Sequence, residues 1–124
     1  MIEVYDFKYK KGKIVGYIDG TNYLDKKKRI QAYLEGSNFI SREEILLVLR
    51  EDGVITYSDG NEQGYLKEGK IFSYINDLLY EFVRNEGKII DSDGNLVLKL
   101  EGGYEKLDDR DFFGIAGYFL ELFS

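Results

Sequence analysis

The chain has 124 residues, enough for one domain with a buried core, and it contains no cysteine and no histidine. Without cysteine it cannot form disulfides, thiol nucleophiles or thiolate metal sites, and without histidine it lacks the commonest general base and metal ligand. The net charge of −6 opposes binding to nucleic acids and anionic membranes, which basic surfaces recognise. We therefore expect a single domain over residues 1–124, with no cofactor, no metal, and neither nucleic acid nor membrane as a partner.

The chain begins Met-Ile-Glu-Val, without the basic and then apolar stretches of a signal peptide. No apolar run approaches the roughly 20 residues that are needed to cross a bilayer. These two features predict a cytoplasmic protein.

The N-terminal part of the chain predicts two β-hairpins. Residues 2–9 alternate between apolar and polar side chains, and a Lys-Lys-Gly-Lys turn joins them to a return strand over residues 14–18. The second hairpin joins residues 22–24 to residues 29–34 through the charged segment Asp-Lys-Lys-Lys at 25–28. This basic run could contact phosphate, but on a chain of net charge −6 we favour a charged hairpin tip.

The clearest hairpin pattern lies at residues 54–69 and returns at residues 88–103. Both segments carry Ser-Asp-Gly-Asn between β-branched or aromatic stretches, and such turns need residues that tolerate positive φ. Gly60 and Gly94 occupy equivalent positions in these turns. The second turn resembles a calcium loop only in part, because Leu96 and Gly102 stand where an EF-hand needs glycine and glutamate. We therefore interpret both segments as hairpin turns.

Six glycines close units of nearly constant length. They are separated by 16, 17, 16, 18 and 16 residues: Gly20, Gly36, Gly53, Gly69, Gly87 and Gly103. Such regular spacing indicates repeats. We expect a mainly β domain of six or seven antiparallel hairpin repeats of 16–18 residues, with the C-terminal segment as a candidate element for closing the array.

Three of these units fit a helix as well as a hairpin. Residues 37–53 contain a capping-box pattern, residues 70–87 carry apolar residues at helical spacing, and residues 104–124 place aspartates ahead of an apolar segment. The regular spacing favours hairpins in all three, and Gly114 and Gly117 weigh against a terminal helix. The alternative is an α+β fold with helices near 71–85 and 109–122.

Alternation also predicts which side chains face the core. A three-residue segment typical of a strand precedes each closing glycine, as Gly16-Tyr17-Ile18 precedes Gly20, and residues 117–119 supply a seventh. The third residue of this segment is apolar in every unit, so it should face inward, with the second residue outside or at a rim. The same alternation assigns one earlier inner-face position to each unit: Ile14, Ile30, Ile45, Glu62, Leu79, Leu96 and Ile115. Glu62 breaks this apolar set, and Glu81 is a second carboxylate expected on an inner face.

The recurring Gly-Lys-Ile, Ser-Asp-Gly-Asn and Gly-Tyr-Leu phrases resemble the bacterial hairpin-repeat proteins known as β-flowers, in which successive hairpins surround a central axis. The resemblance covers residues 1–103 in outline and is specific in units 54–69 and 88–103. It implies a fold and a bacterial protein, and it carries no activity and no functional residues.

Two groups of aromatic residues are candidates for binding. Tyrosine is the one compositional excess, with eleven residues, and four of them share one repeat position: Tyr17, Tyr33, Tyr65 and Tyr118. Tyrosine suits a recognition surface because it offers a large rigid contact area with a polar end, although packing between strands also explains it. The C-terminal segment supplies a candidate interface: Phe112, Phe113, Phe119 and Phe123. Burial of this segment as a closing element is the alternative.

These observations predict a non-catalytic binding or protein-interaction module, such as an inhibitor or an immunity-type protein, whose partner is another protein or a second copy of the chain. The alternative is a small carboxylate- or metal-dependent enzyme. Its visible candidates are Asp108, Asp109, Asp111, Glu62 and Glu81. For the three aspartates a helix cap or a solvated turn is the simpler interpretation.

Overall fold

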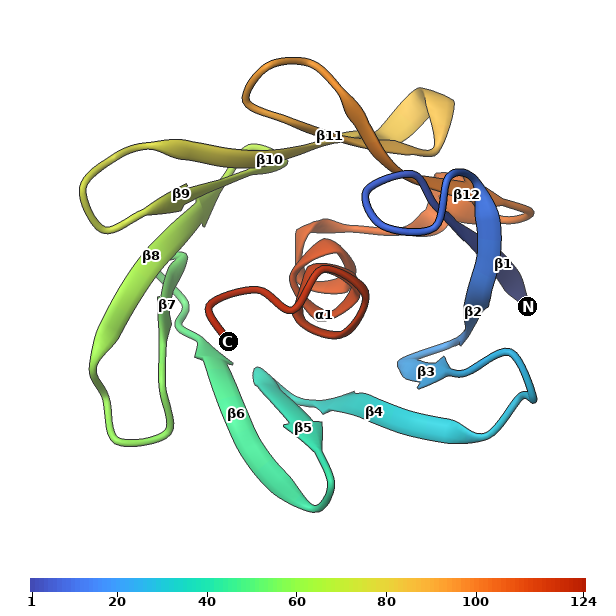
Figure 1. Ribbon diagram of the computed structural model, residues 1–124. Coiled ribbons are helices and arrows are strands. Elements are labelled where there is room, and N and C mark those ends of the chain that lie inside the picture. Colours follow the sequence, from blue (N-terminus) through green and yellow to red (C-terminus); the bar gives the residue numbers. More distant parts are fainter.

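The computed structural model describes residues 1–124, which form a closed ring of twelve antiparallel strands around a single helix (Figure 1). The strands are β1 (Ile2–Asp6), β2 (Lys13–Asp19), β3 (Asn22–Leu24), β4 (Ile30–Glu35), β5 (Asn38–Ser41), β6 (Glu44–Leu49), β7 (Val54–Thr56), β8 (Glu62–Lys67), β9 (Lys70–Ser73), β10 (Leu78–Val83), β11 (Lys88–Asp91) and β12 (Leu96–Glu101). The helix is α1 (Asp109–Phe119), and the 3-10 turns are η1 (Arg84–Glu86) and η2 (Tyr104–Lys106).

The strands form six hairpins, which we number 1 to 6 from β1–β2 to β11–β12. Each hairpin also pairs with the next one, and β12 pairs with β1, so the sheet has no end strand. We call the six turns within hairpins the hairpin tips, and the turns that join one hairpin to the next the inter-hairpin turns. The two sets lie at opposite ends of the ring. The prediction of a mainly β fold built from hairpin repeats is confirmed.

The regularly spaced glycines lie in the inter-hairpin turns or, for the last of them, directly after β12. All six have positive φ, between 61° and 90°. Residues with a Cβ reach this region only at a cost of roughly 1–2 kcal/mol, whereas glycine reaches it freely. The regularly spaced glycines therefore mark the same structural position in each repeat.

Four hairpin tips adopt the same turn. In hairpin 6, for example, the amide of Asp91 donates to the carbonyl of Asn95 (2.9 Å), and the amide of Gly94 donates to the carbonyl of Asp91 (3.0 Å). Hairpins 2, 4 and 5 repeat both bonds. The third loop residue has positive φ in all four: Lys28, Gly60, Asn76 and Gly94. The two Ser-Asp-Gly-Asn segments are thus turns, as expected.

We expect Gly60→Val and Gly94→Val each to lower the free energy of unfolding by about 1–2 kcal/mol or more, because valine is β-branched and resists positive φ. Nothing lies within 4 Å of a Cβ at either position, so the cost is conformational and not a clash. Lys27→Val is the control, because Lys27 precedes the positive-φ residue of its turn. Urea denaturation measures all three, and equal losses would contradict the equivalence of the turns.

Two of the three ambiguous segments are hairpins. Residues 37–53 contain β5 and β6, joined by a two-residue turn in which Arg42 and Glu43 both have positive φ (53° and 64°). Residues 70–87 contain β9 and β10, so the alternative helix near 71–85 is wrong. The C-terminal segment is the helix α1, so a seventh hairpin over residues 104–124 is wrong and the alternative helix near 109–122 is correct.

A bulge in every hairpin corrects the expected inner-face positions. The pairing register shifts once in each hairpin, and the second strand contributes the extra residue: Val15, Gln31, Leu46, Gln63, Leu79 and Val97. One extra residue reverses the alternation of faces beyond it. For this reason Ile30 and Ile45 are exposed (58% and 40%) and Glu62 is also exposed, contrary to the expectation for this position.

Hairpin 5 deviates by one further residue. Phe82 is buried there and Val83 is half-buried, whereas alternation predicted the reverse. The connection to Gly87 contains the three-residue turn η1, which lengthens this unit. Residues at the same distance before the closing glycine therefore do not occupy equivalent strand positions in this unit. Phe82 is the residue whose amide bonds to the carbonyl of Gly69, as Leu66 bonds to Gly53. Its neighbour Glu81 therefore faces the outside of the ring and not the core.

The helix fills the lumen of the ring. Its residues Phe112, Phe113, Ile115 and Ala116 are completely buried against the inner faces of the strands. Phe112 packs on Phe82 with ring centroids 5.5 Å apart, and Phe113 packs edge to face with Phe39 of β5. One helix thus supplies the centre of the hydrophobic core, and the side chains of all six hairpins surround it.

The two helix glycines allow this close packing. A Cβ on Gly114 would lie 1.9 Å from the Tyr23 hydroxyl oxygen and 2.9 Å from a Leu34 carbon, and a Cβ on Gly117 would lie 3.1 Å from the Phe39 ring. Glycine lowers helix propensity, which is why both residues counted against a helix. Their lack of a side chain is what permits the helix to lie inside the ring.

The N-terminus of α1 is fixed by a capping box. The Asp108 carboxylate accepts the Asp111 amide (2.9 Å), and the Asp108 amide donates to the Asp111 carboxylate (3.0 Å). The bond from the Asp111 amide lowers the pKa of Asp108, while burial raises the pKa of Asp111. Two further contacts tie the helix to inter-hairpin turns: Arg84 pairs with Asp109 (2.8 Å), and Arg110 donates to the Gly36 carbonyl (2.5 Å).

Tyr23 contributes a buried hydroxyl that has no hydrogen-bond partner. Burial raises the pKa of this phenol far above its ordinary value, and the negative charge of Asp111 raises it further. The unfolded chain loses the tyrosine proton near pH 10, whereas the folded chain retains it. Stability from this group is therefore complete below pH 10 and falls as the pH rises above 10, by about 1.4 kcal/mol per unit.

We expect Tyr23→Phe to stabilise the protein by about 1–3 kcal/mol at neutral pH, because it removes a desolvated hydroxyl that has no partner. It should also flatten the loss of stability between pH 10 and pH 11. Urea denaturation at pH 8, 10 and 11 measures both effects. Tyr65→Phe is the control, because the Tyr65 hydroxyl bonds to Asn76 at the surface (3.0 Å). A destabilised Tyr23→Phe at pH 8 would contradict the expectation.

Candidate functional site

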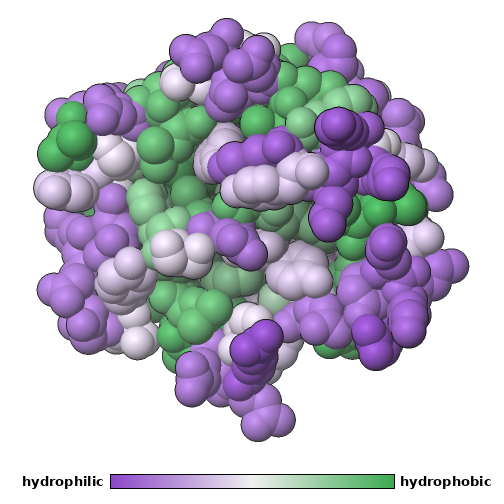
Figure 2. Space-filling view, in the orientation of Figure 1, coloured by the Kyte–Doolittle hydropathy of each residue, from purple (hydrophilic) through white to green (hydrophobic).

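Exposed apolar side chains gather at the hairpin tips. Nine large apolar residues are exposed, and eight of them lie in the tips or within three residues of them: Phe7, Tyr9, Ile30, Ile45, Leu46, Tyr57, Tyr74 and Ile75. Only Met1 lies at the other end of the ring. In Figure 2, which views the ring along its axis from the side of the C-terminus, green apolar patches interrupt the polar surface.

The C-terminal residues form the floor of this end. Residues 120–124 leave the helix and turn within the ring of tips, where Leu120 and Leu122 are buried and Phe123 is half-buried (Figure 1). The Tyr57 hydroxyl donates to the Phe123 carbonyl (2.8 Å), which ties this tail to hairpin 4. We call the hairpin tips together with residues 118–124 the tip-side face. It is concave, because pockets open between the tail and the surrounding tips.

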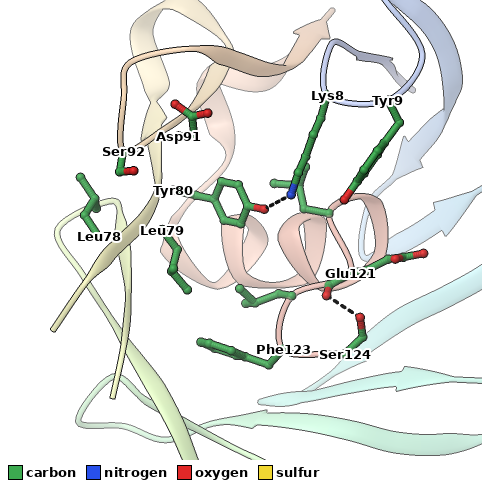
Figure 3. A pocket seen from close by; sticks show the side chains of 12 residues that line it. Lys8, Tyr9, Leu78, Leu79, Tyr80, Asp91, Ser92, Glu121, Phe123 and Ser124 are labelled. Atoms are coloured by element: carbon green, nitrogen blue, oxygen red, sulfur yellow. Dashed lines mark hydrogen bonds between the residues drawn. The ribbon is translucent and has the colours of Figure 1, made fainter. Parts of the chain in front are cut away.

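One pocket of about 360 Å³ lies between the tips of hairpins 1 and 6, strand β10 and the tail (Figure 3). Lys8 extends into it, and its ammonium group donates to the Tyr80 hydroxyl (2.6 Å) and lies 5.2 Å from the ring centroids of Tyr9 and Tyr80. Burial lowers the pKa of Lys8, but the two phenols raise it by more. Lys8 forms no salt bridge, so a positive charge lies beside an apolar wall of Leu79 and Phe123.

A second pocket of about 420 Å³ separates hairpin 3 from hairpin 4, and we call it the β6–β7 cleft. Its walls are residues 44–47 of β6 on one side and Tyr57 and Ser58 on the other. Phe39, Gly117 and the tail residues Leu122–Ser124 complete its lining. Ile45 and Leu46 are 40% and 42% exposed here. The cleft is therefore lined mainly by apolar side chains, of which Ile45, Leu46 and Tyr57 are exposed to water.

Charge on the tips is divided between the two halves of the ring. Hairpins 1 and 2, which are neighbours, carry eight exposed basic residues: Lys8, Lys10, Lys11, Lys13, Lys26, Lys27, Lys28 and Arg29. Hairpins 4, 5 and 6 carry only acidic charges in their tips: Asp59, Asp77, Asp91 and Asp93. Of these twelve residues only Arg29 forms a salt bridge, with Asp25. The tip-side face therefore has a basic half and an acidic half.

The tyrosines of the candidate binding surface do not form one stripe. Tyr17, Tyr33 and Tyr65 lie on the outer face of β2, β4 and β8, where each is half-buried. We call the paired strands of two neighbouring hairpins a seam. Each of these tyrosines pairs across a seam with a residue of the next hairpin: Leu24, Ile40 and Phe72 respectively. Tyr118 lies on α1 and stacks on Tyr23 with ring centroids 6.5 Å apart. Packing between strands accounts for these positions, and binding by them stays a prediction.

The phenylalanines of the candidate interface are divided between the core and the surface. Phe112 and Phe113 are completely buried in the lumen, so they are core residues and no part of a free surface. The alternative interpretation, that the C-terminal segment is buried, is therefore the correct one for Phe112 and Phe113. Phe119 and Phe123 are half-buried and border pockets of the tip-side face. An interface through this second pair stays a prediction.

The candidate carboxylates do not converge on one site. Asp108 and Asp111 form the capping box, Asp109 pairs with Arg84, and Glu62 pairs with Arg50 (3.2 Å). Glu81 lies on the outer face of β10, opposite Lys70 and Ile90. No group of three or more carboxylates is arranged to hold a metal ion.

Sequence reasoning missed the residues that form the tip-side face, among them Lys8, Tyr80, Leu46 and Tyr57. The available signal was the presence of large apolar residues directly beside predicted turns, where polar residues are expected. No helix of the structure is long and apolar enough to cross a membrane. The closed ring of hairpins agrees with the fold that the β-flower resemblance implies. The chain matches no family model, no curated protein and no solved structure.

Proposed function

We propose that the protein is a non-catalytic binding module that recognises another protein through its tip-side face. One observation carries this proposal: eight of the nine exposed large apolar side chains lie at one end of the ring. Exposed apolar residues are normal when scattered, but a gathering of them among polar residues is typical of an interaction site. Membership of the β-flower group is part of the same proposal and adds no activity to it.

The architecture suits recognition. The tips are loops held by a closed ring whose strands are all paired with neighbours, and binding residues are commonly carried on loops of a rigid scaffold. The basic and acidic halves of the face would orient a partner with the complementary arrangement of charge. An inhibitor or an immunity-type protein is the version of this function that we favour, because such a protein needs only a surface and no catalytic group.

The alternative function, a small carboxylate- or metal-dependent enzyme, finds less support. Four of its candidate carboxylates are used in the helix cap or in salt bridges, and the fifth, Glu81, lies apart from them on β10. Calorimetric titration with Mg²⁺, Ca²⁺ and Mn²⁺ tests it directly. Binding of one equivalent of any of these ions would favour the enzyme.

A matched pair of variants tests the binding function. Tyr74 and Ile75 are 73% and 62% exposed at the tip of hairpin 5, so Tyr74→Ser with Ile75→Ser should leave the fold intact. Glu105→Ser with Lys106→Ser alters η2, outside the hairpin tips, without changing the net charge. Immobilised wild-type protein and both variants are incubated with host lysate, and captured proteins are quantified. A partner lost only by the tip variant is expected, and equal capture by both variants would contradict the tip-side face as the binding surface.

A further inference from the structure

The seam between hairpins 3 and 4 is the shortest in the ring. Strands β6 and β7 pair only through Val48 with Thr56 and Leu49 with Ile55, whereas every other pair of neighbouring hairpins shares three or four residue pairs. Within residues 44–47 of β6, all but the bulge residue Leu46 pair with β5 on one side, and none pairs with a strand on the other. An unpaired strand edge exposes backbone donors and acceptors that another chain can bind.

This free edge borders the β6–β7 cleft. Ile45 and Leu46 on the edge and Tyr57 on the opposite wall are 40%, 42% and 37% exposed, so an inserted apolar side chain would remove apolar surface from water on both sides. The volume of the β6–β7 cleft, about 420 Å³, lies in the usual range of ligand pockets, roughly 300–1,000 Å³. The cleft therefore offers backbone pairing and apolar burial at the same place.

The charges around the cleft are mainly negative. Glu43 and Glu44 at the start of β6 and Asp59 in the facing tip are exposed, and none of them forms a salt bridge. Arg42 is the only cation in either of the two tips. An occupant with basic residues beside its apolar ones would match these carboxylates, whereas an acidic one would be repelled.

We infer that the β6–β7 cleft binds an extended segment of a partner protein in which apolar and basic residues alternate, and that the segment adds to β6 as a further strand. Strand addition obtains affinity from backbone hydrogen bonds and specificity from pockets that take alternate side chains. The inference rests on the proposed function, because it names the partner chemistry for one part of the tip-side face.

A short peptide and its methylated twin test the inference. The probe is acetyl-Lys-Val-Lys-Ile-Lys-Val-amide, and the twin carries N-methyl groups on alternate backbone nitrogens, which removes strand pairing and retains the side chains. Binding is followed by NMR titration and by amide hydrogen exchange. We expect saturable binding of the probe, at least tenfold weaker binding of the twin, and slower exchange within residues 44–47. Residues 13–16 of β2 also lack a partner strand on one side, and their exchange should not change.

Two variants locate the site. Leu46→Ser should weaken binding of the probe at least tenfold, because it removes apolar surface from the cleft while the exposed position tolerates serine. Ile30→Ser changes an even more exposed residue (58% against 42%) on hairpin 2 and should leave binding unchanged. Failure of the probe to bind, equal binding of the twin, or equal effects of the two variants would each overturn the inference. These outcomes leave the lysate experiment unaffected, because that experiment alters only hairpin 5 and η2.

Discussion

Deletion of residues 109–124 should unfold the protein. The segment supplies seven buried residues to the lumen and its floor: Phe112, Phe113, Gly114, Ile115, Ala116, Leu120 and Leu122. Burial of each large apolar side chain contributes about 1.5–3 kcal/mol, so the five large ones together contribute about 7.5–15 kcal/mol. This is as much as the roughly 5–15 kcal/mol by which a typical domain is stable. Deletion also exposes the inner faces of all six hairpins. The twelve strands then have no core around which to close.

Circular dichroism, amide dispersion in NMR spectra and heat denaturation measure the outcome. We expect a deletion variant without a cooperative transition, and partial recovery of the transition when a peptide covering residues 107–124 is added. Deletion of residues 121–124 alone is the control, because it retains the helix and removes one large buried side chain, Leu122. A deletion variant that still melts cooperatively would show that the hairpins hold the ring without the helix.

Gly114→Ala should lower the free energy of unfolding by about 3 kcal/mol or more, although alanine favours a helix over glycine by about 1 kcal/mol. The added methyl would meet the Tyr23 hydroxyl at 1.9 Å, the carbon that bears it at 2.7 Å and Leu34 at 2.9 Å. All three atoms belong to buried side chains, so the ring must expand or the helix must shift. Overpacking of this kind typically costs about 1–3 kcal/mol, and the near-contact with three atoms places this site at the upper end.

Gly117→Ala is the matched comparison on the same helix. The three atoms nearest to its methyl would all belong to the Phe39 ring, at 3.1–3.2 Å, so a small movement of that ring relieves the closest contacts. The gain in helix propensity should offset most of that cost, and we expect a change within about 1 kcal/mol. Urea denaturation with a chevron analysis measures both variants. Equal changes at the two glycines would mean that the separation between α1 and the β3–β4 hairpin is not set by Gly114.

The hairpins were predictable because their signals are local. Gly60 and Gly94 mark turns that need positive φ, and the spaced glycines mark the inter-hairpin turns in the same way. The helix was harder to predict, since the aspartates ahead of it suggested a helix cap but Gly114 and Gly117 argued against a helix. The need for Gly114 depends on Tyr23 and Leu34, which lie about 90 and 80 residues earlier in the chain.

The faces of the strands and the candidate site were not predictable for a different reason. A bulge adds one residue without a characteristic sequence, so nothing in the sequence around Gln31 or Leu46 showed that alternation reverses there. The tip-side face depends on which tips are neighbours around the ring. Lys8 and Tyr80 are 72 residues apart and meet only because β12 returns to pair with β1.

The position of α1 in the chain order has a consequence for biosynthesis. A ribosome makes the six hairpins first, and each can form locally within about 1–10 μs, long before the next is complete at 5–20 residues per second. Residues 109–119, which occupy the lumen, emerge only afterwards. For several seconds the nascent chain therefore presents hairpins whose apolar inner faces have nothing to cover them, and this is the interval in which chaperones would bind and in which self-association competes with ring closure.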